Sequence, residues 1–244
     1  MPAKANRDPA RAARRRGGAI LRCRAMSLLF CDLDNTLIDR AAGYRAWAEH
    51  YVAGLGREPG EVEWLVRIDH DGTRPREPLF EEARARWGIA TPVTELIEQY
   101  RSEYPAFVRA IDPGVARRLA GLRRGGWSIA VVTNGPPSQR VKVERSGLSP
   151  LVDVVVISDE LGVSKPDRRI FEAAARQAGS DIAQAWLVGD NPEADIGAAV
   201  EMGIPGIWLR RGRSWTETRW RPFAVADSLE EALDLVPPAG EARR

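Results

Sequence analysis

The chain has 244 residues, of which 44% are hydrophobic and 29% charged, and its formal net charge is +2. This apolar content is enough to bury a full core in one large domain or two modest ones, which argues against a disordered chain. No apolar run approaches the roughly 20 residues that cross a bilayer, and the first residues lack the apolar segment of a secretory signal, so we expect a cytoplasmic protein without membrane association.

The first 25 residues differ in charge from the rest. They contain eight Lys or Arg and one Asp, a charge of +7, whereas the remainder is mildly acidic. They have no periodic apolar face, which is typical of a disordered segment. A nucleic-acid-binding arm and an Arg-rich transit peptide are the alternatives, and no nucleic-acid partner is expected. Because Met26 stands two residues before the first apolar run, we interpret it as the true start and residues 1–25 as an upstream extension.

From Met26 onward one pattern recurs, in which a short apolar run is followed by a turn and then by a helix-length amphipathic stretch. Runs that are apolar on both faces are typical of parallel strands covered by helices. The predicted strands are 28–31, 128–132, 153–158, 185–189, 206–209 and a weaker one at 223–226. The predicted crossover helices are 138–146, 168–178 and 192–202. The fold class is therefore α/β, with a Rossmann-like parallel sheet core covered by helices.

One interval is too long for a crossover, because more than 90 residues separate Asp34 from the second strand. Helical patterns occur in it near 42–55, 59–68, 78–88 and 92–103, before a further helix at 113–124. We expect residues 40–112 to form a helical cap inserted after the first strand, and residues 26–39 and 113–244 to form the core. The predicted hinges are Asp39–Ala41 and Ile111–Gly114.

Polar residues collect at the C-terminal ends of the predicted strands, which is where open parallel sheets bind their ligands. In chain order they are Asp32, Asp34, Thr133, Asn134, Lys165, Asp190 and Asp195. Carboxylates this close repel one another unless a cation joins them, and hard oxygen ligands favour Mg²⁺ over Zn²⁺. The two histidines, His50 and His70, lie in the insertion, so neither is expected to bind this metal.

Four sequence motifs carry a family resemblance. DLDNT at 32–36, Thr133 in VVTNG, Lys165 in SKPD and GDNPEAD at 189–195 resemble the four ordered motifs of the haloacid dehalogenase-like (HAD) superfamily. The likeness extends from residue 28 to about 236, and the insertion is similar to the helical cap of some members. It implies a Mg²⁺-dependent phosphatase that hydrolyses a small-molecule phosphate monoester, as a monomer or a homodimer.

The resemblance also assigns roles to individual residues. It makes Asp32 the nucleophile that forms an aspartyl-phosphate, and Asp34 the general acid and base. It assigns Mg²⁺ to Asp32, the main-chain carbonyl of Asp34, and Asp190. The phosphate group would be bound by Thr133, Asn134 and Lys165.

Asp195 would orient Lys165 or a water molecule at the metal.

Each of these residues also has a structural alternative. Asp190 could cap the helix that begins near Pro192, and Asp195 could be purely structural. Thr133 could be an ordinary strand residue, Asn134 part of a turn, and Lys165 a solvated loop charge, although the last option leaves the carboxylates without a protein cation.

The same core supports other chemistries. By the resemblance, dehalogenating members lack an acid two residues after the nucleophile, so the presence of Asp34 favours phosphate chemistry. A phosphomutase would use the same core and a similar cap. A catalytically silent binding domain would have lost the nucleophile or the acid, and the sequence retains both.

Substrate choice is expected to depend on the insertion, since the core is common to many activities. The candidates there are Arg40, Tyr44, Arg45, Arg74 and Arg76. Their charges favour a small polar monophosphate, such as a sugar phosphate, phosphoglycolate or a nucleotide. Lys142 is expected to be exposed on an amphipathic helix. Glu160 is expected to be a surface acid, with support of Lys165 as the alternative.

Overall fold

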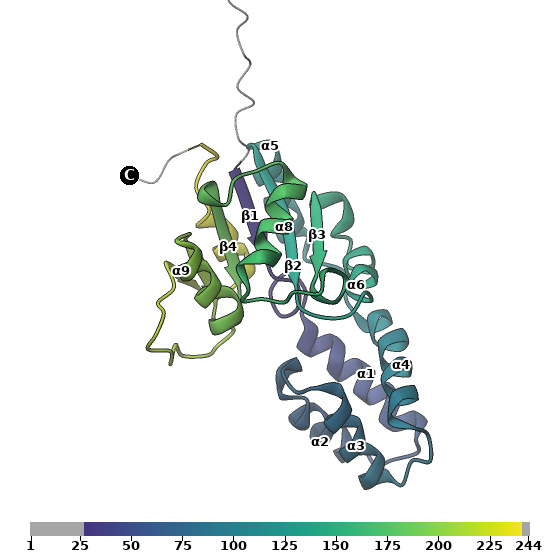
Figure 1. The fold of residues 1–244 in the computed structure, drawn as a ribbon. Coiled ribbons are helices and arrows are strands. Elements are labelled where there is room, and N and C mark those ends of the chain that lie inside the picture. The colour runs from purple at the N-terminus through teal and green to yellow at the C-terminus, as the bar shows by residue number, and fades with distance from the viewer. Residues whose placement is uncertain (1–26, 241–244) are drawn as a thin grey trace, which may run out of the picture.

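The computed structural model describes residues 27–240, so the expectations for residues 1–25 lie outside the described residues. Figure 1 shows two parts, a sheet flanked by helices and a group of helices that projects from one end of the sheet. Within residues 27–240, no helix is both long and apolar enough to span a membrane.

The sheet has six parallel strands in the order β3-β2-β1-β4-β5-β6. Their bounds are β1 Ser27–Cys31, β2 Trp127–Thr133, β3 Val154–Ile157, β4 Ala185–Gly189, β5 Gly206–Leu209 and β6 Ala224–Ala226. The chain runs outward from β1 to β3, then returns to the other side of β1, so the strand order reverses next to β1. Cys31 pairs with Val131 on β2 and Val188 on β4. The predicted parallel α/β sheet is confirmed, and the ends of β1, β2 and β4 lie side by side.

Helices cover both faces of this sheet, because successive residues of a strand point to opposite faces. Leu28 and Phe30 of β1 pack with Phe171 in one core cluster, whereas Leu29 and Cys31 belong to another. The helices outside the insertion are α5 Pro113–Arg124, α6 Gln139–Arg145, α7 Ser158–Leu161, α8 Arg168–Ala178, α9 Ala198–Met202 and α10 Leu229–Asp234. The predicted helix at 192–202 is found, but its first part is a π-helix, η6 (Pro192–Gly197). α10 was not predicted.

The helices of the insertion are α1 Arg40–Gly54, α2 Gly60–Ile68, α3 Arg76–Trp87 and α4 Val93–Glu103, with short 3₁₀ turns η2 His70–Gly72 and η3 Tyr104–Phe107. The five helices predicted from 42 to 124 are thus confirmed. The Asp39 side chain accepts a hydrogen bond from the Ala42 amide and caps α1 immediately after β1. Trp47 is fully buried among aromatic and aliphatic side chains of α1 to α4. Burial of a large apolar side chain contributes about 1.5–3 kcal/mol. The apolar cluster that contains Trp47 continues into one face of the sheet, where it includes Leu29 and Ile129.

Candidate active site

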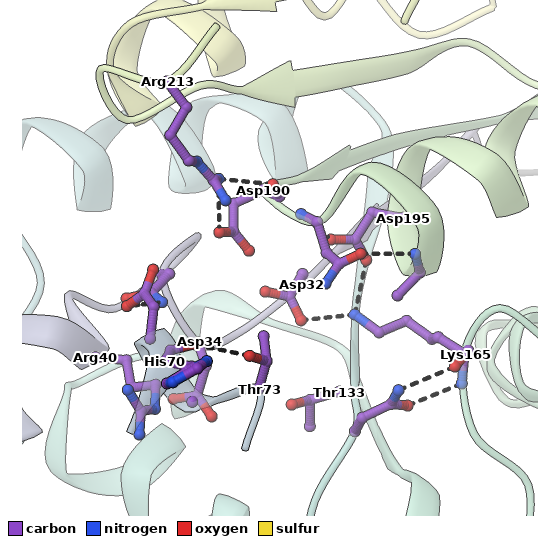
Figure 2. Close-up of a pocket in the computed structure, with 16 residues that line it drawn as sticks. Asp32, Asp34, Arg40, His70, Thr73, Thr133, Lys165, Asp190, Asp195 and Arg213 are labelled. Atoms are coloured by element: carbon purple, nitrogen blue, oxygen red, sulfur yellow. Dashed lines mark hydrogen bonds and ion pairs between the residues drawn. The ribbon is translucent and has the colours of Figure 1, made fainter. Parts of the chain in front are cut away.

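The predicted site residues meet in one cavity of about 340 Å³ at the C-terminal ends of the strands (Figure 2). All seven of them line it, namely Asp32, Asp34, Thr133, Asn134, Lys165, Asp190 and Asp195. Residues up to 163 positions apart in the sequence come together because β1, β2 and β4 are neighbours in the sheet.

A buried lysine lies at the centre of this cavity. Lys165 Nζ donates to Asp32 Oδ1 at 2.6 Å and to Asp195 Oδ1 at 2.8 Å. Burial alone would lower the pKa of Lys165, but the two carboxylates outweigh it and raise that pKa. Lys165 therefore carries a positive charge between Asp32 and Asp195 at any ordinary pH. Glu160, expected to be a surface acid, is exposed and pairs with Arg140, and it does not take the alternative role of supporting Lys165.

The loop after β4 fixes Asp195. The Asn191 amide donates to Asp195 Oδ2 at 2.9 Å, and the Asn191 side chain accepts from the amides of Glu193 and Ala194 at the start of η6. A Cβ at Gly189 would come well inside 3.0 Å of the Asp195 side chain, a distance that Cβ atoms essentially never reach. The sequence thus needs glycine at the end of β4 to admit this carboxylate.

Thr133 and Asn134, at the end of β2, have neighbours in the protein. Thr133 Oγ1 accepts a hydrogen bond from Gln139 Nε2 at 2.7 Å. The Asn134 side chain donates to the Lys165 carbonyl at 3.0 Å and accepts from the Lys165 amide at 2.8 Å. Asn134 therefore holds the backbone of Lys165, and a contact from Asn134 to phosphate stays a prediction.

Three carboxylates in the cavity could bind a cation. Asp32, Asp190 and Asp195 each offer an oxygen within 4.8 Å of the others, and all three are buried. Burial raises the pKa of Asp32 to about 7, against the opposing charge of Lys165, and raises that of Asp190 to about 6 with a further contribution from Asp195. Crowded, buried oxygen donors of this kind fit Mg²⁺. The main-chain carbonyl of Asp34, the third ligand expected from the sequence, stays a prediction.

The expectation that Lys142 is exposed was wrong. Lys142 is only 5% exposed, and its Nζ donates to Asp34 Oδ1 at 2.9 Å and Oδ2 at 2.7 Å. Gln139, three residues earlier on α6, also donates to Asp34, at 2.9 Å. Burial would raise the pKa of Asp34, but the Lys142 charge outweighs it and that pKa is lowered. The three-residue spacing of Gln139 and Lys142 was the one signal that could have revealed this polar inner face of α6.

The insertion contributes a wall of the cavity through Arg40 and residues 70–73. Asp71 accepts hydrogen bonds from Asn35 Nδ2 at 2.9 Å and from Arg211 Nη1 at 2.9 Å, so this turn is tied to the loops after β1 and β5. At Gly72, whose φ is +89°, a Cβ would lie 2.6 Å from Arg40 Nε, which requires glycine there.

The other candidates from the insertion separate into two groups. Arg74 and Arg76 line a second cavity that adjoins the first. Tyr44 and Arg45 line neither cavity. Tyr44 is buried inside the insertion, whereas Arg45 lies at the surface and pairs with Glu63. For Tyr44 and Arg45 the expected contact with a substrate was therefore wrong.

Comparisons with known proteins agree with this geometry. The model of the haloacid dehalogenase-like hydrolase family matches residues 26–203. A phosphoserine phosphatase of Thermus thermophilus is 32% identical, with 85% of this chain and 98% of that protein aligned. A phosphoglycolate phosphatase of Cupriavidus necator is 31% identical over 84% of this chain and 89% of that protein. The solved structure of a β-phosphoglucomutase homologue from Thermotoga maritima is similar with a TM-score of 0.69 at 17% identity, covering 86% of this chain and 98% of that one, and it bears on the fold alone.

Proposed function

This chain belongs to the haloacid dehalogenase-like hydrolase family, and on that premise we propose that it is a Mg²⁺-dependent phosphatase that cleaves a small-molecule phosphate monoester through an aspartyl-phosphate. The observation that carries the proposal is the position of Lys165 between the carboxylates of Asp32 and Asp195 in a cavity that Asp34 also lines. The phosphatase names of the two aligned relatives support the same reaction.

In the first half of the reaction, a carboxylate oxygen of Asp32 would attack phosphorus in line with the ester oxygen. The bond from phosphorus to the ester oxygen breaks, and the departing alkoxide takes a proton from the carboxyl group of Asp34. Lys165 would place its positive charge beside the phosphoryl oxygens, where negative charge increases in the transition state. The Thr133 hydroxyl would donate to one of these oxygens.

In the second half, Asp34 would act as the base. It would accept a proton from a water molecule whose oxygen attacks phosphorus, the bond from phosphorus to Asp32 breaks, and inorganic phosphate leaves. The lowered pKa of Asp34 suits this half, because a base must begin as the carboxylate. Lys142 and Gln139 would keep Asp34 in place between turnovers.

A magnesium ion would be held by the carboxylates of Asp32 and Asp190 together with the main-chain carbonyl of Asp34. When bound, it would offset the negative charges that the nucleophile and a phosphate bring together. The chain's own part is to keep Asp190 buried beside Asp32, which Trp208 and Arg213 support by donating hydrogen bonds to the Asp190 carbonyl.

The insertion, residues 40–112, would serve as a cap over this site, with hinges at Asp39–Ala41 and Ile111–Gly114. It supplies Arg40 and the turn at 70–73 to the cavity wall, so its closure would exclude water from the aspartyl-phosphate until the leaving group departs.

The test is an assay of the purified protein against a panel of phosphate esters, with Mg²⁺ and with EDTA. We expect release of inorganic phosphate only with Mg²⁺, and no turnover by Asp32→Asn. A phosphomutase would convert a sugar monophosphate to its isomer without releasing phosphate, and a dehalogenase would release halide from a 2-haloacid. Either result, with no phosphate released from any ester, would overturn the proposal.

A further inference from the structure

A second cavity of about 270 Å³ adjoins the first at the boundary between the insertion and the sheet. Five residues line both cavities, namely Asp34, Arg40, Gly72, Thr73 and Asn134. The second cavity extends from this shared boundary to Arg76, Tyr100 and Tyr104 of the insertion and to Lys142 of α6. A small molecule held in the first cavity can thus reach into the second.

Positive charge exceeds negative charge in the second cavity. Arg40 makes a two-point ion pair with Asp69, at 2.7 and 2.9 Å, and Arg76 contacts the same carboxylate at 2.6 Å. Lys142 pairs with Asp34. These three cations therefore share two carboxylates. Arg74 and Arg101, at the edge of the cavity, are each balanced by their own glutamate and add no surplus.

The residues that carry this excess of positive charge are largely buried. Arg40 is 4% exposed, and Asp69 is 1% exposed beneath it. A cation without a partner in a weakly solvated place is costly, so an anion that enters the cavity gains more there than at the protein surface. An arginine also presents its donors in a fixed plane that matches the two oxygens of a carboxylate.

The aromatic side chains of this cavity are already in contact with one another or with cations. Tyr100 and Tyr104 stack with their ring centres 5.3 Å apart. Arg76 lies over the Tyr100 ring at 4.9 Å, and Lys142 lies over the Tyr104 ring at 4.8 Å. A nucleobase would have to displace these contacts in order to stack, which disfavours a nucleotide and favours a small anion.

Asp34 fixes which end of a substrate faces which cavity. If Asp34 protonates the ester oxygen, that oxygen lies at the shared boundary, the phosphoryl group lies beside Asp32 and Lys165, and the remainder of the leaving group extends toward Arg76 and Lys142. We propose that the second cavity binds a carboxylate of the leaving group, so that the preferred substrate is a small phosphorylated hydroxy acid. This inference rests on the proposed phosphatase function.

The test compares two esters that differ only in the group expected to reach the second cavity. 2-Phosphoglycolate carries a carboxylate where ethyl phosphate carries a methyl group. With wild-type protein and Mg²⁺ we expect kcat/KM to be at least about tenfold higher for 2-phosphoglycolate, the advantage of one charge-assisted pair. Arg76→Gln should reduce that preference by about tenfold, and Arg76→Lys should keep part of it.

Arg76 is the suitable position to change because Asp69 keeps its two-point pair with Arg40 in the variant, so no buried charge is left alone. The matched control is Arg45→Gln, which removes another arginine of the insertion that lies at the surface with Glu63. It should leave the preference unchanged. Equal kcat/KM for the two esters, or an equal loss of preference in the control, would overturn the inference.

Failure of this inference can be separated from failure of the proposed function. If ethyl phosphate and 2-phosphoglycolate are both hydrolysed at equal efficiency, the phosphatase proposal stands and the carboxylate site does not. If neither ester is hydrolysed, calorimetry can still measure the affinity of each ester for Asp32→Asn with Mg²⁺ and so test the carboxylate site. At least about tenfold tighter binding of 2-phosphoglycolate, lost in Asp32→Asn/Arg76→Gln, would support the site, and equal binding would overturn it.

Discussion

Lys142 Nζ lies within hydrogen-bond distance of both carboxylate oxygens of Asp34, at 2.9 and 2.7 Å, although the two residues are 108 positions apart in the chain. The pair joins α6 to the loop after β1, immediately beside Asp32. The ionisation of Asp34 is therefore controlled by a helix that follows β2 and lies outside the four motifs that identified the site.

The first prediction concerns this pair. Lys142→Met removes the ammonium that holds the Asp34 pKa down, while burial still raises it, so the pKa of Asp34 rises in the variant. An acid donates only while it is protonated. The alkaline limb of the profile of kcat/KM against pH should therefore move to higher pH.

The control is Arg140→Met, which removes a cation from the exposed side of the same helix, where it pairs with Glu160. Its pH profile should match the wild type. An unchanged profile in Lys142→Met would mean that Asp34 is not the general acid or that Lys142 does not set its pKa.

The second prediction concerns the two aspartates after β1. Asp32→Asn should remove turnover, because an amide nitrogen or oxygen cannot replace the attacking carboxylate. Asp34→Asn should keep a low turnover rate, about 10²–10⁴-fold below that of the wild type, because this is the usual contribution of a general acid–base. Steady-state rates, with acid-quenched mass spectrometry to detect a phosphorylated Asp32 in Asp34→Asn, test both. Wild-type activity in Asp32→Asn would exclude the covalent route.

The third prediction uses the raised pKa values of Asp32 and Asp190, about 7 and about 6. Both exceed the value of about 3.9 for an unfolded aspartate. The protons these carboxyls hold in the folded state therefore stabilise it fully below about pH 4, and that contribution is lost as the pH rises through 6 and 7. Mg²⁺ would pair with the charged forms, so the rise in Tm that it causes should be larger at pH 8 than at pH 5.

Thermal unfolding with EDTA and with saturating Mg²⁺, at each pH, measures this difference. Asp190→Asn should lose most of the Mg²⁺ effect at pH 8. An equal rise in Tm at both pH values, or none at either, would argue against a cation among these carboxylates.

Much of the fold could be predicted because its signals are local. Apolar runs locate the strands, 3.6-residue periodicity locates the helices, and the order of strands and helices implies a parallel sheet. The meeting of Asp32 and Lys165 also followed from the motifs, although only Asp32 directly follows a strand, whereas Lys165 lies in the loop between α7 and α8. Every site residue taken from the motifs lines the cavity, although the role of each stays a prediction.

The predictions that were wrong concern side chains whose direction depends on how a helix is rotated against its neighbours. Tyr44 and Arg45 are adjacent on α1 and point about 100° apart, so their directions depend on the rotation of α1, which the sequence pattern does not give. Tyr44 packs inward and Arg45 outward. Lys142 looked exposed because α6 reads as amphipathic, whereas its inner face carries polar groups that meet Asp34. Packing between elements that are distant in the sequence sets these orientations, so the local sequence pattern does not predict them.

The fourth prediction tests the glycine at the end of β4. In Gly189→Ala the new Cβ would overlap the Asp195 side chain, so Asp195 must move and Lys165 loses one of its two carboxylate partners. We expect a loss of about 1–3 kcal/mol in the free energy of unfolding, with a large loss of kcat. The control is Gly54→Ala, where the Cβ meets nothing within 4 Å, and its stability should stay equal or rise by up to about 1 kcal/mol. Equal stability of the two variants would contradict the packing argument.

The last prediction concerns the turn that brings the insertion to the cavity. Asp71 pairs with Arg211 from the loop after β5, and three residues of this contact, His70, Asp71 and Arg211, have left-handed backbone angles, with φ of 50°, 54° and 49°. Such angles cost about 1–3 kcal/mol each, so contacts like this pair must hold them. Asp71→Asn keeps a residue that tolerates the left-handed region while removing the charge.

We expect Asp71→Asn and Arg211→Gln each to raise KM about 3–10-fold, because the turn no longer closes the cavity wall, with little change in Tm. The double variant should be no worse than either single variant, since both remove the same interaction. Hydrogen exchange should become faster for the amides of residues 70–76 in all three proteins. Arg219→Gln, which breaks an exposed pair with Glu201 outside the cavity, is the control and should change neither measurement. Additive increases in KM would show that Asp71 and Arg211 act separately, and unchanged exchange in this turn would show that their pair does not hold it.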